Sequence, residues 1–460
     1  MRTELVSGNE TISVELPDDT VFPSAGITVP FPVCEDLEGE VARALREPLD
    51  SAPLSDLARG ARRVTVAFDD PTVQMYAPLW PVAIRALLAE LEAAGVDARQ
   101  VDLLCANALH RKWTHDELAK LIGEDLVTAF ADRLTCHDAE DPEHLVDLGT
   151  TPGGLHVELN KACVDSDLVV YVNCSTVRGF SGGWKSICVG LSTYRSIRHH
   201  HNPDDMSMSL HRNRMHAMLD EMGALVTDRL GSHRFFKLET VEANPLQVSR
   251  VFGGTVDACR QAAVELRKAH QPARRDLIDD PADVVVYGVP DWSPYAAFAY
   301  TNRLLTLVST GLGYLGGVIE AFGAPGCTAV LATPCPDRWD DHHHPSYRDV
   351  WENVLPVTRD PYQIEREHSE AYAARPEYVD AYRHHNAFHG SHAVMATFPL
   401  KRLRHAGRVV VAGATDPSLP RHVGFDATET VEEAVSDALS AHGPGARVAC
   451  VRYPQAWNRA

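Results

Sequence analysis

Short β-branched runs alternate with helix-like segments along this chain, and that rhythm limits its fold more than any other feature. The first cycle contains, in order, RRVTVAFDD, PLWPVAIRALLAELEAAGV, QVDLLCANAL, THDELAKLIG and SDLVVYVNC. Strand, loop and helix repeated in this way predict βαβ units around a sheet that is mainly parallel. Catalytic groups are then expected on the loops that leave the carboxyl ends of the strands, where an open α/β sheet has its crevice.

A second cycle indicates a second domain. It begins at ADVVVYGVP near residue 282, continues through CTAVLATP and GRVVVAGA, and closes with TVEEAVSDALSAHG and ARVACVRYP. The 460 residues exceed the length at which one hydrophobic core keeps growing, and HQPARRDLIDDPAD has the prolines and charges of a linker. We therefore predict two α/β domains with mainly parallel sheets: a catalytic, cofactor-binding domain over residues 1–274 and a domain over residues 275–460 that contributes substrate contacts. The active site is expected in the cleft between them.

Charge and composition restrict the partners. The formal net charge of -20 at pH 7 would repel nucleic acid and anionic membrane surfaces, so a small-molecule partner is expected. Residues 1–16 lack the apolar core of a signal peptide, and no later stretch reaches about 18 uninterrupted apolar residues, which predicts a cytoplasmic protein. The ten cysteines form no CxxC pair and follow no regular spacing, so neither a zinc cluster nor a disulfide framework is indicated.

The strand SDLVVYVNC runs into a glycine-rich loop, STVRGFSGGWKSICVG, that presents a lysine. Glycines let a backbone bend sharply and approach a ligand closely. A P-loop needs glycine immediately before its lysine, and because Trp184 stands there, nucleotide hydrolysis is not indicated. The segment alone agrees either with a cofactor site or with a tight turn and a solvated lysine. The loop contains Gly179, Gly182 and Gly183, and the next helix opens with Lys185 and Ser186.

Histidines follow three of the predicted strands. His110 lies in CANALHRKWTHDEL, His137 lies in LTCHDAED, and the triple 199–201 follows Lys185. A neutral imidazole binds nickel, copper or zinc, and it also moves protons near pH 7. Any one of these residues is equally consistent with a hydrogen-bonded structural histidine, and the triple with a polar helix face. Their recurrence in comparable loops favours a functional site.

A fourth loop, VTVAFDDPTVQMYAP, offers Asp69, Asp70 and Thr72 directly after the first strand. Aspartates bind metals, hold hydroxyl groups or orient histidines, and a threonine hydroxyl can bond to a phosphate oxygen. Asp-Pro also opens ordinary turns, so both interpretations remain open here.

Taken together, these loops resemble the lactate racemase family that uses a nickel-pincer nucleotide, and the likeness runs over nearly the whole chain. It is carried by DDPTVQ, ALHRKWTHDEL, CHDAED and GFSGGWKSICVGLSTYRSIRHHH. The family pattern has GFSGG, one variable residue, a lysine and a histidine sixteen positions later; counted from Lys185, that histidine is His201.

The resemblance implies a cofactor, pyridinium-3,5-bisthiocarboxylic acid mononucleotide nickel, joined to Lys185 as a thioamide and held through nickel by His201. It further implies that His110 takes the proton from a substrate hydroxyl while hydride passes from the α-carbon to the cofactor ring. Cofactor-synthesis enzymes are the implied partners. The remaining residues expected to bind the cofactor are Asp70, Thr72, Gly182, Gly183 and Ser186.

The chain departs from the family pattern where the substrate is handled. The second acid/base histidine of the family corresponds to Ser175, and a serine hydroxyl is a poor base unless another group activates it. The arginine that holds the carboxylate corresponds to Val73, and the glutamine and lysine contacts of the second domain fall on Thr301 and Leu304. Arg178 or Arg303 is a candidate replacement cation, since a guanidinium binds carboxylates well, although either also fits an ordinary surface position.

The leading hypothesis is a nickel-pincer nucleotide-dependent racemase or epimerase that acts on a 2-hydroxyacid or a related hydroxylated substrate other than lactate. One alternative is a one-base oxidoreductase or isomerase on the same cofactor. The other is a non-catalytic homologue that only binds the cofactor. The oligomeric state is not predicted.

Overall fold

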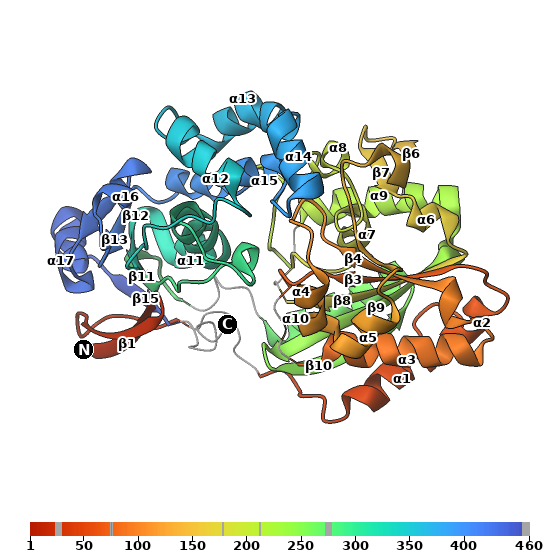
Figure 1. The fold of residues 1–460 in the computed structure, drawn as a ribbon. Helices are drawn as coiled ribbons and strands as arrows, with labels where there is room; N and C mark the ends of the chain where they lie inside the picture. Colours follow the sequence, from red (N-terminus) through yellow and green to blue (C-terminus); the bar gives the residue numbers. More distant parts are fainter. Residues whose placement is uncertain are drawn as a thin grey trace. The chain divides into compact units, whose positions relative to one another are not determined.

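The computed structural model describes residues 1–23, 30–73, 75, 77–176, 179–210, 213–271 and 278–452. The chain forms two compact units, each with its own sheet (Figure 1). The six-stranded unit consists of Pro30–His270 and Val379–His389. The five-stranded unit consists of Met1–Val29, Gln271–Tyr378 and Gly390–Ala460.

This division differs from the expected one at the N-terminus. Residues 1–23 pack with the later half of the chain because Gly8 forms a β-bridge to Pro290 and Val21 forms one to Ala449. The expected boundary between residues 274 and 275 lies outside the described residues.

The larger sheet is α/β and mainly parallel, as predicted. Its strands run parallel to their neighbours except for the antiparallel pair at one edge. In spatial order the strands are β10 (Gln247–Gly254), β9 (Phe235–Asn244), β8 (Leu168–Ser175), β3 (Val64–Asp69), β4 (Val101–Ala106) and β5 (Leu134–Cys136). Because β3 lies between β8 and β4, the loops that follow these three strands leave the same edge of the sheet, next to one another.

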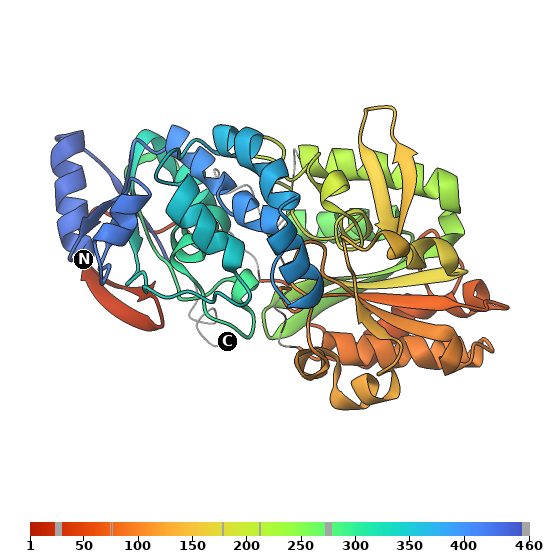
Figure 2. The same ribbon diagram turned by 45° about the horizontal axis from the view of Figure 1, so that its top comes forward.

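Helices cover this sheet on both faces. In Figures 1 and 2, α1 and α3 lie on one face and α9 lies on the other. Local sequence explains where they start; for example, Thr114 and Glu117 form a reciprocal capping box at the start of α4. The helices are α1 (Leu37–Arg46), α2 (Leu54–Ala58), α3 (Leu79–Ala93), α4 (His115–Ile122), α5 (Glu124–Ala129), α6 (Ala162–Asp165), α7 (Lys185–Cys188), α8 (Tyr194–Ile197), α9 (Arg214–Leu230) and α10 (Val256–His270). An antiparallel hairpin of β6 (Leu145–Thr150) and β7 (His156–Asn160) contacts α9.

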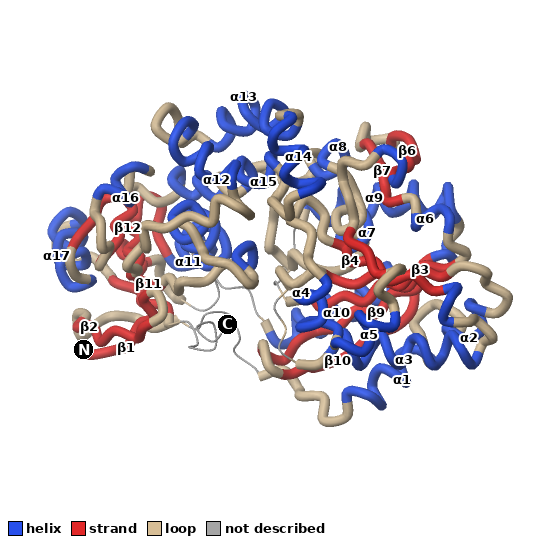
Figure 3. Tube along the Cα trace, viewed as in Figure 1, coloured by secondary structure: helices blue, strands red, loops and turns tan. Residues whose placement is uncertain are grey.

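The second sheet is parallel throughout. Its order is β14 (Asp426–Thr428), β13 (Arg408–Ala412), β12 (Gly323–Ala332), β11 (Ala282–Gly288) and β15 (Val448–Val451). One core cluster joins valines of the central strands to α17 (Val431–His442) and to the hairpin of β1 (Arg2–Ser7) and β2 (Glu10–Glu15). Figure 3 shows these strands in red with helices in blue around them.

The other helices that follow β11 along the chain are α11 (Gly317–Phe322), α12 (Pro345–Asp349), α13 (Pro361–Ala373), α14 (Pro376–His384), α15 (Gly390–Met395) and α16 (Ser418–His422). A π-helix spans Leu305–Leu315, and nearly all of its side chains are buried. Within the described ranges, no helix combines the length and apolar character needed to cross a bilayer.

Candidate functional site

Asp70, in the loop after β3, orients His110, which follows β4. The Asp70 Oδ2 atom lies 3.0 Å from His110 Nδ1, and Oδ1 accepts a 2.5 Å bond from the Thr72 hydroxyl. The indole N–H of Trp113 also donates to Oδ2, at 3.2 Å. Because an ionised carboxylate only accepts, His110 carries its hydrogen on Nδ1, and Nε2 has the lone pair that a general base needs. Of the interpretations that the sequence left open for this loop, the contacts of Asp70 match an aspartate that orients a histidine.

The turn that carries His110 is held in an unusual backbone conformation. Ala108 has φ +50, a region that non-glycine residues rarely adopt. It is kept there by a bond from its N–H to the Gly190 carbonyl, at 3.0 Å, and by the side chain of Asn107, which donates to the His110 carbonyl at 3.1 Å. Strain of this kind persists where the surroundings enforce it, often at functional loops.

The glycine-rich loop after β8 lies directly on a buried carboxylate. The backbone N–H of Gly183 donates to Glu239 Oε2 at 2.7 Å. A Cβ atom on Gly182 would stand 2.1 Å from Glu239 Oε1, and Gly182 also has φ +92. This position therefore requires glycine both for space and for conformation. Sequence analysis predicted a close approach of this backbone to a ligand, and the approach seen here is to Glu239.

Three charged side chains hold the glycine-rich loop in place. Lys237 and Glu239, both in β9, have no solvent exposure, and Arg260 in α10 lies 3.9 Å from Glu239. Arg260 donates to the carbonyls of Ser181 and Gly179, while Lys237 donates to the Gly183 carbonyl and to the Ser186 hydroxyl. Sequence analysis missed these residues. The available signal was the pair of opposite charges two positions apart in the apolar strand FFKLETV, where both side chains point to one face.

Lys185 and His201 contact the same aromatic ring. The Lys185 Nζ atom lies 4.3 Å from the centroid of the Phe180 ring, and the His201 ring meets Phe180 edge-on with centroids 5.9 Å apart. Phe180 thus brings together the two residues that the family spacing singled out.

The environment of Lys185 makes its amine easier to deprotonate than that of a free lysine. Burial lowers the pKa of Lys185 to about 8, the positive charges of Lys237 and Arg260 act in the same direction, and the carboxylates of Asp69 and Asp70 oppose the shift. An unprotonated amine is the form that can bond covalently to an acyl-type carbon. Asp70 therefore acts on Lys185 through its charge and on His110 through a hydrogen bond.

His200 and His201 form a hydrogen-bonded pair through their Nδ1 atoms, 2.7 Å apart. His200 is fully buried, and its Nε2 atom has no hydrogen-bond partner among the described residues. Burial, with the nearby charge of Lys185, lowers the pKa of His200 to about 3, so this ring is neutral. A buried imidazole nitrogen without a described partner, close to an amine whose pKa is lowered, fits a site that binds a further group.

The hydroxyl groups of Ser175 and Ser186 make hydrogen bonds that hold the glycine-rich loop in place. The Ser175 hydroxyl is fully buried and donates to the Ser181 carbonyl at 3.2 Å, with Glu239 Oε1 at 3.5 Å. The Ser186 hydroxyl accepts from Lys237. Both hydroxyl groups therefore make bonds within the loop and its buried supports.

Two other polar residues of the strand-end loops have internal partners. His137 is fully buried, its ring nitrogens bond to the Ser192 carbonyl and to Asn160, and burial lowers its pKa to about 4. Asp69 accepts bonds from the backbone of Cys174 and from two side chains, Asn173 and Tyr171, while burial raises its pKa to about 6. For these two residues the structural alternative matches the observed contacts.

The residues expected to contact substrate are scattered. Val73 is half-buried in the turn after Asp70, and Arg178 lies outside the described residues. Thr301, in the five-stranded unit, is buried and contacts the hydroxyl of Thr306 at 3.1 Å.

Arg303, also in the five-stranded unit, is held by neighbouring side chains. It donates to Asp337, and its guanidinium lies 5.0 Å from the centroid of the Trp339 ring. Its side chain is only 15% exposed, so Arg303 is not an ordinary surface arginine.

The described residues offer no cluster of three or more His, Cys, Asp or Glu side chains that could hold a metal by themselves. The lowered pKa of Lys185 and the hydrogen-bonded pair of His200 and His201 suit a site that binds a further group.

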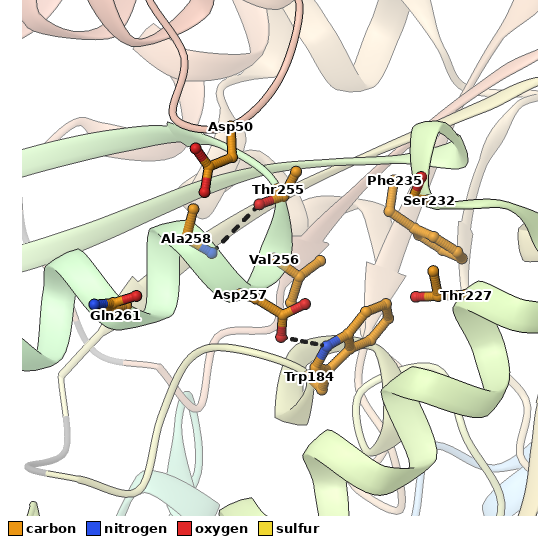
Figure 4. Close-up of a pocket in the computed structure, with 10 residues that line it drawn as sticks. All are labelled: Asp50, Trp184, Thr227, Ser232, Phe235, Thr255, Val256, Asp257, Ala258 and Gln261. Carbon is orange, nitrogen blue, oxygen red and sulfur yellow. Dashed lines mark hydrogen bonds between the residues drawn. The ribbon is translucent and has the colours of Figure 1, made fainter.

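A pocket of about 300 Å³ lies in the six-stranded unit, where the start of α10 faces the end of α9. Figure 4 shows Trp184 turned toward Asp257, to which its indole N–H donates at 2.9 Å. None of the candidate residues named above lines this pocket. Its lining residues are Asp50, Trp184, Thr227, Ser232, Phe235, Thr255, Val256, Asp257, Ala258 and Gln261.

Comparisons with known proteins agree with the loop pattern. The family model of the lactate racemase N-terminal domain matches residues 7–213. The lactate racemase of Lactiplantibacillus plantarum is 28% identical over 236 residues, which cover 50% of this chain and 53% of that protein. The lactate racemase of Thermoanaerobacterium thermosaccharolyticum is 30% identical over 205 residues, covering 43% of this chain and 46% of that protein. The chain thus matches about half the length of these curated relatives.

Solved structures extend the likeness in fold to the whole chain. The lactate racemase apoprotein from Thermoanaerobacterium thermosaccharolyticum superposes with a TM-score of 0.68 at 20% identity, covering 98% of each chain. A protein from Thermotoga maritima superposes with a TM-score of 0.53 at 16% identity, covering 90% of this chain and 95% of that one. Residues 7–213 thus match the lactate racemase N-terminal domain, and the chain shares its fold with the lactate racemase apoprotein.

Proposed function

We propose that this chain is an isomerase that racemises or epimerises a hydroxylated small molecule other than lactate, with a nickel-pincer nucleotide bound through Lys185 and His201. The observation that carries the proposal is the shared contact of Lys185 and His201 with the Phe180 ring. The negative charge of Asp70 also acts on the amine of Lys185. When bound, the cofactor supplies the hydride acceptor and the nickel ion.

In this proposal His110 moves the hydroxyl proton. Its Nε2 atom accepts the proton from the substrate hydroxyl as the carbon–hydrogen bond breaks, and returns it when that bond forms again. Asp70 stabilises the imidazolium that forms in between, because its carboxylate is 3.0 Å from Nδ1 and almost fully buried. Thr72 and Trp113 keep Asp70 in place through their own bonds to it.

The glycine-rich loop positions the amine of Lys185, to which the cofactor would be joined. Glu239, Lys237 and Arg260 fix the loop backbone, and this leaves Lys185 at the start of a short helix with its amine over Phe180. The partners of the chain include cofactor-synthesis enzymes, and we place the activity in the cytoplasm with them.

Two features support a substrate other than lactate. Val73 stands where the resemblance implies a carboxylate-binding arginine, and its side chain has no charge. Arg303, one of the two candidate replacements, already donates to Asp337, and its guanidinium lies 5.0 Å from the centroid of the Trp339 ring. The substrate is therefore a hydroxylated compound whose recognition depends less on a carboxylate than that of lactate does.

The test uses protein produced together with cofactor-synthesis enzymes and incubated in D₂O with a panel of 2-hydroxyacids, sugar acids and polyols. Inversion at a carbinol carbon with retention of its original hydrogen is the expected result, because the same hydride returns. Chiral chromatography with mass spectrometry measures both. If protein that carries cofactor and nickel turns over no member of the panel, the chain is a non-catalytic cofactor-binding homologue.

One observation favours a second candidate, a one-base oxidoreductase or isomerase on the same cofactor. Ser175, which replaces the second acid/base histidine of the family pattern, has a buried hydroxyl that bonds to the Ser181 carbonyl. A carbonyl product, or deuterium from solvent at the carbinol carbon, would favour this candidate over the racemase.

A further inference from the structure

His200 is the buried residue of the site whose hydrogen bonds are least explained. Its Nδ1 atom lies 2.7 Å from Nδ1 of His201, and its Nε2 atom has no partner in the described parts of the chain. The ring has no solvent exposure, so bulk water cannot serve as the partner of Nε2.

The contact between the two rings restricts where their hydrogens lie. Two neutral imidazoles that meet through Nδ1 atoms share one hydrogen, so one ring donates and the other accepts. If His200 donates, the hydrogen of His201 is on Nε2, which then has no lone pair for a metal. If His201 donates, its Nε2 can bind a metal, and the hydrogen of His200 moves to Nε2, the atom without a partner.

Only the second arrangement suits nickel, and it leaves a buried N–H without an acceptor. An unsatisfied buried donor is costly, and such donors are rare in folded proteins. The donor therefore needs a partner that arrives with the bound group.

We propose that His200 is a positioning residue with two functions: its Nδ1 accepts from His201 and so turns the lone pair of His201 Nε2 to nickel, and its own Nε2–H donates to an acceptor on the bound cofactor. This rests on the proposed function, because it presupposes the cofactor at Lys185. Hydrogen-bond partners of metal-binding histidines fix the ring tautomer in this way, and their loss typically weakens metal binding about 10–100-fold.

Three substitutions separate the two functions. His200→Asn keeps a polar atom near the position of Nδ1, His200→Gln keeps one near the position of Nε2, and His200→Leu keeps neither. His233→Leu, at an exposed histidine of the same unit, is the matched control. Each variant is produced with cofactor-synthesis enzymes, and its Lys185 adduct is measured by intact-protein mass spectrometry. Nickel content per adduct and the visible absorption spectrum are then followed during dialysis against a chelator.

We expect His200→Leu to form the Lys185 adduct and to lose nickel about 10-fold faster or more, with a shifted visible spectrum. His200→Asn should retain nickel better than His200→Gln does, because the bond to His201 sets the metal-binding nitrogen. The control should match the wild type. Thermal unfolding of the unloaded proteins checks that the Asn and Gln variants fold.

Two outcomes would overturn the inference. One is a His200→Leu variant that keeps nickel and spectrum as the wild type does. The other is a His200→Asn variant that loses nickel as fast as His200→Leu. A wild-type protein with no adduct and no nickel would instead overturn the proposed function, so the two failures are distinguishable.

Discussion

Asp70 connects side chains from the loops that follow β3 and β4. Its hydrogen bonds make the positions of three side chains depend on one carboxylate. It binds His110, Thr72 and Trp113 at distances of 2.5 to 3.2 Å. The sequence left three interpretations of an aspartate in this loop open: a residue that orients a histidine, a metal ligand and a turn residue. Only the fold, which places β3 beside β4, distinguishes these alternatives.

Replacing Asp70 with Asn removes the negative charge that stabilises protonated His110. We expect kcat on a substrate found with the panel to fall about 10²–10⁴-fold in Asp70→Asn, the range typical of a disrupted acid/base group. Asp132→Asn is the matched control, because it makes the same change of charge at a side chain that is 85% exposed. An Asp70→Asn variant with wild-type kcat would contradict the assignment of His110 as the base.

Lys185 is expected to react as an amine at a lower pH than free lysine. Burial lowers its pKa to about 8, so the neutral, nucleophilic fraction rises through half near that pH. A model-peptide lysine reaches the same point at about 10.4. Acylation of the unloaded protein at a series of pH values, followed by peptide mass spectrometry, measures the midpoint at Lys185. A midpoint equal to that of the model peptide would show that the amine is solvated.

At the scale of elements, the local sequence pattern predicted the strands and helices. It did not predict the residues that support the glycine-rich loop. The runs VTVAFD, VDLLCA and LVVYVNCS form β3, β4 and β8 as predicted, because a parallel sheet buried on both faces needs continuous apolar strands. Lys237 and Glu239 in β9 were not predicted as parts of the loop site. Their function depends on the path of a loop more than 50 positions earlier in the chain, which no local pattern encodes.

Gly182→Ala tests the close approach of the loop to Glu239. The substitution adds a Cβ atom 2.1 Å from Glu239 Oε1 at a residue with φ +92. Gly60→Ala is the matched control, because Gly60 has φ +80 and nothing within 4 Å. We expect the control to lower the free energy of unfolding by about 1 kcal/mol and Gly182→Ala to lower it by about 3 kcal/mol, in urea unfolding. Equal losses would mean that the loop moves freely away from Glu239.

At the scale of the whole chain, the residues that begin the sequence form a two-stranded hairpin that packs with the five-stranded sheet of the later half. Leu5 in β1 and Val14 in β2 are buried in one cluster with Val284 of β11. The sequence predicted both α/β cycles and their order, but it assigned residues 1–23 to the first domain. That pairing spans more than 280 positions between Gly8 and Pro290, and alternation within the hairpin does not reveal its partner.

Leu5→Ala is therefore expected to weaken the five-stranded unit. Truncating a buried leucine costs about 2–5 kcal/mol, and Leu5 is 2% exposed. Hydrogen exchange should show faster exchange of the amides in β11 and β12 and unchanged amides in β3 and β8. Leu246→Ala is the control, because that side chain is 65% exposed. Loss of protection in β3 rather than in β11 would contradict the observed division.

The central claim is that Lys185 and His201 hold a nickel-bearing nucleotide. Intact-protein mass spectrometry with metal analysis, on protein produced with cofactor-synthesis enzymes, tests it most directly. Lys185→Ala is compared with the wild type, and Lys268→Ala, at an exposed lysine of the same unit, is the control. We predict a covalent adduct and bound nickel in the wild type and in Lys268→Ala, and an unmodified mass in Lys185→Ala. An unmodified, nickel-free wild type would contradict the claim.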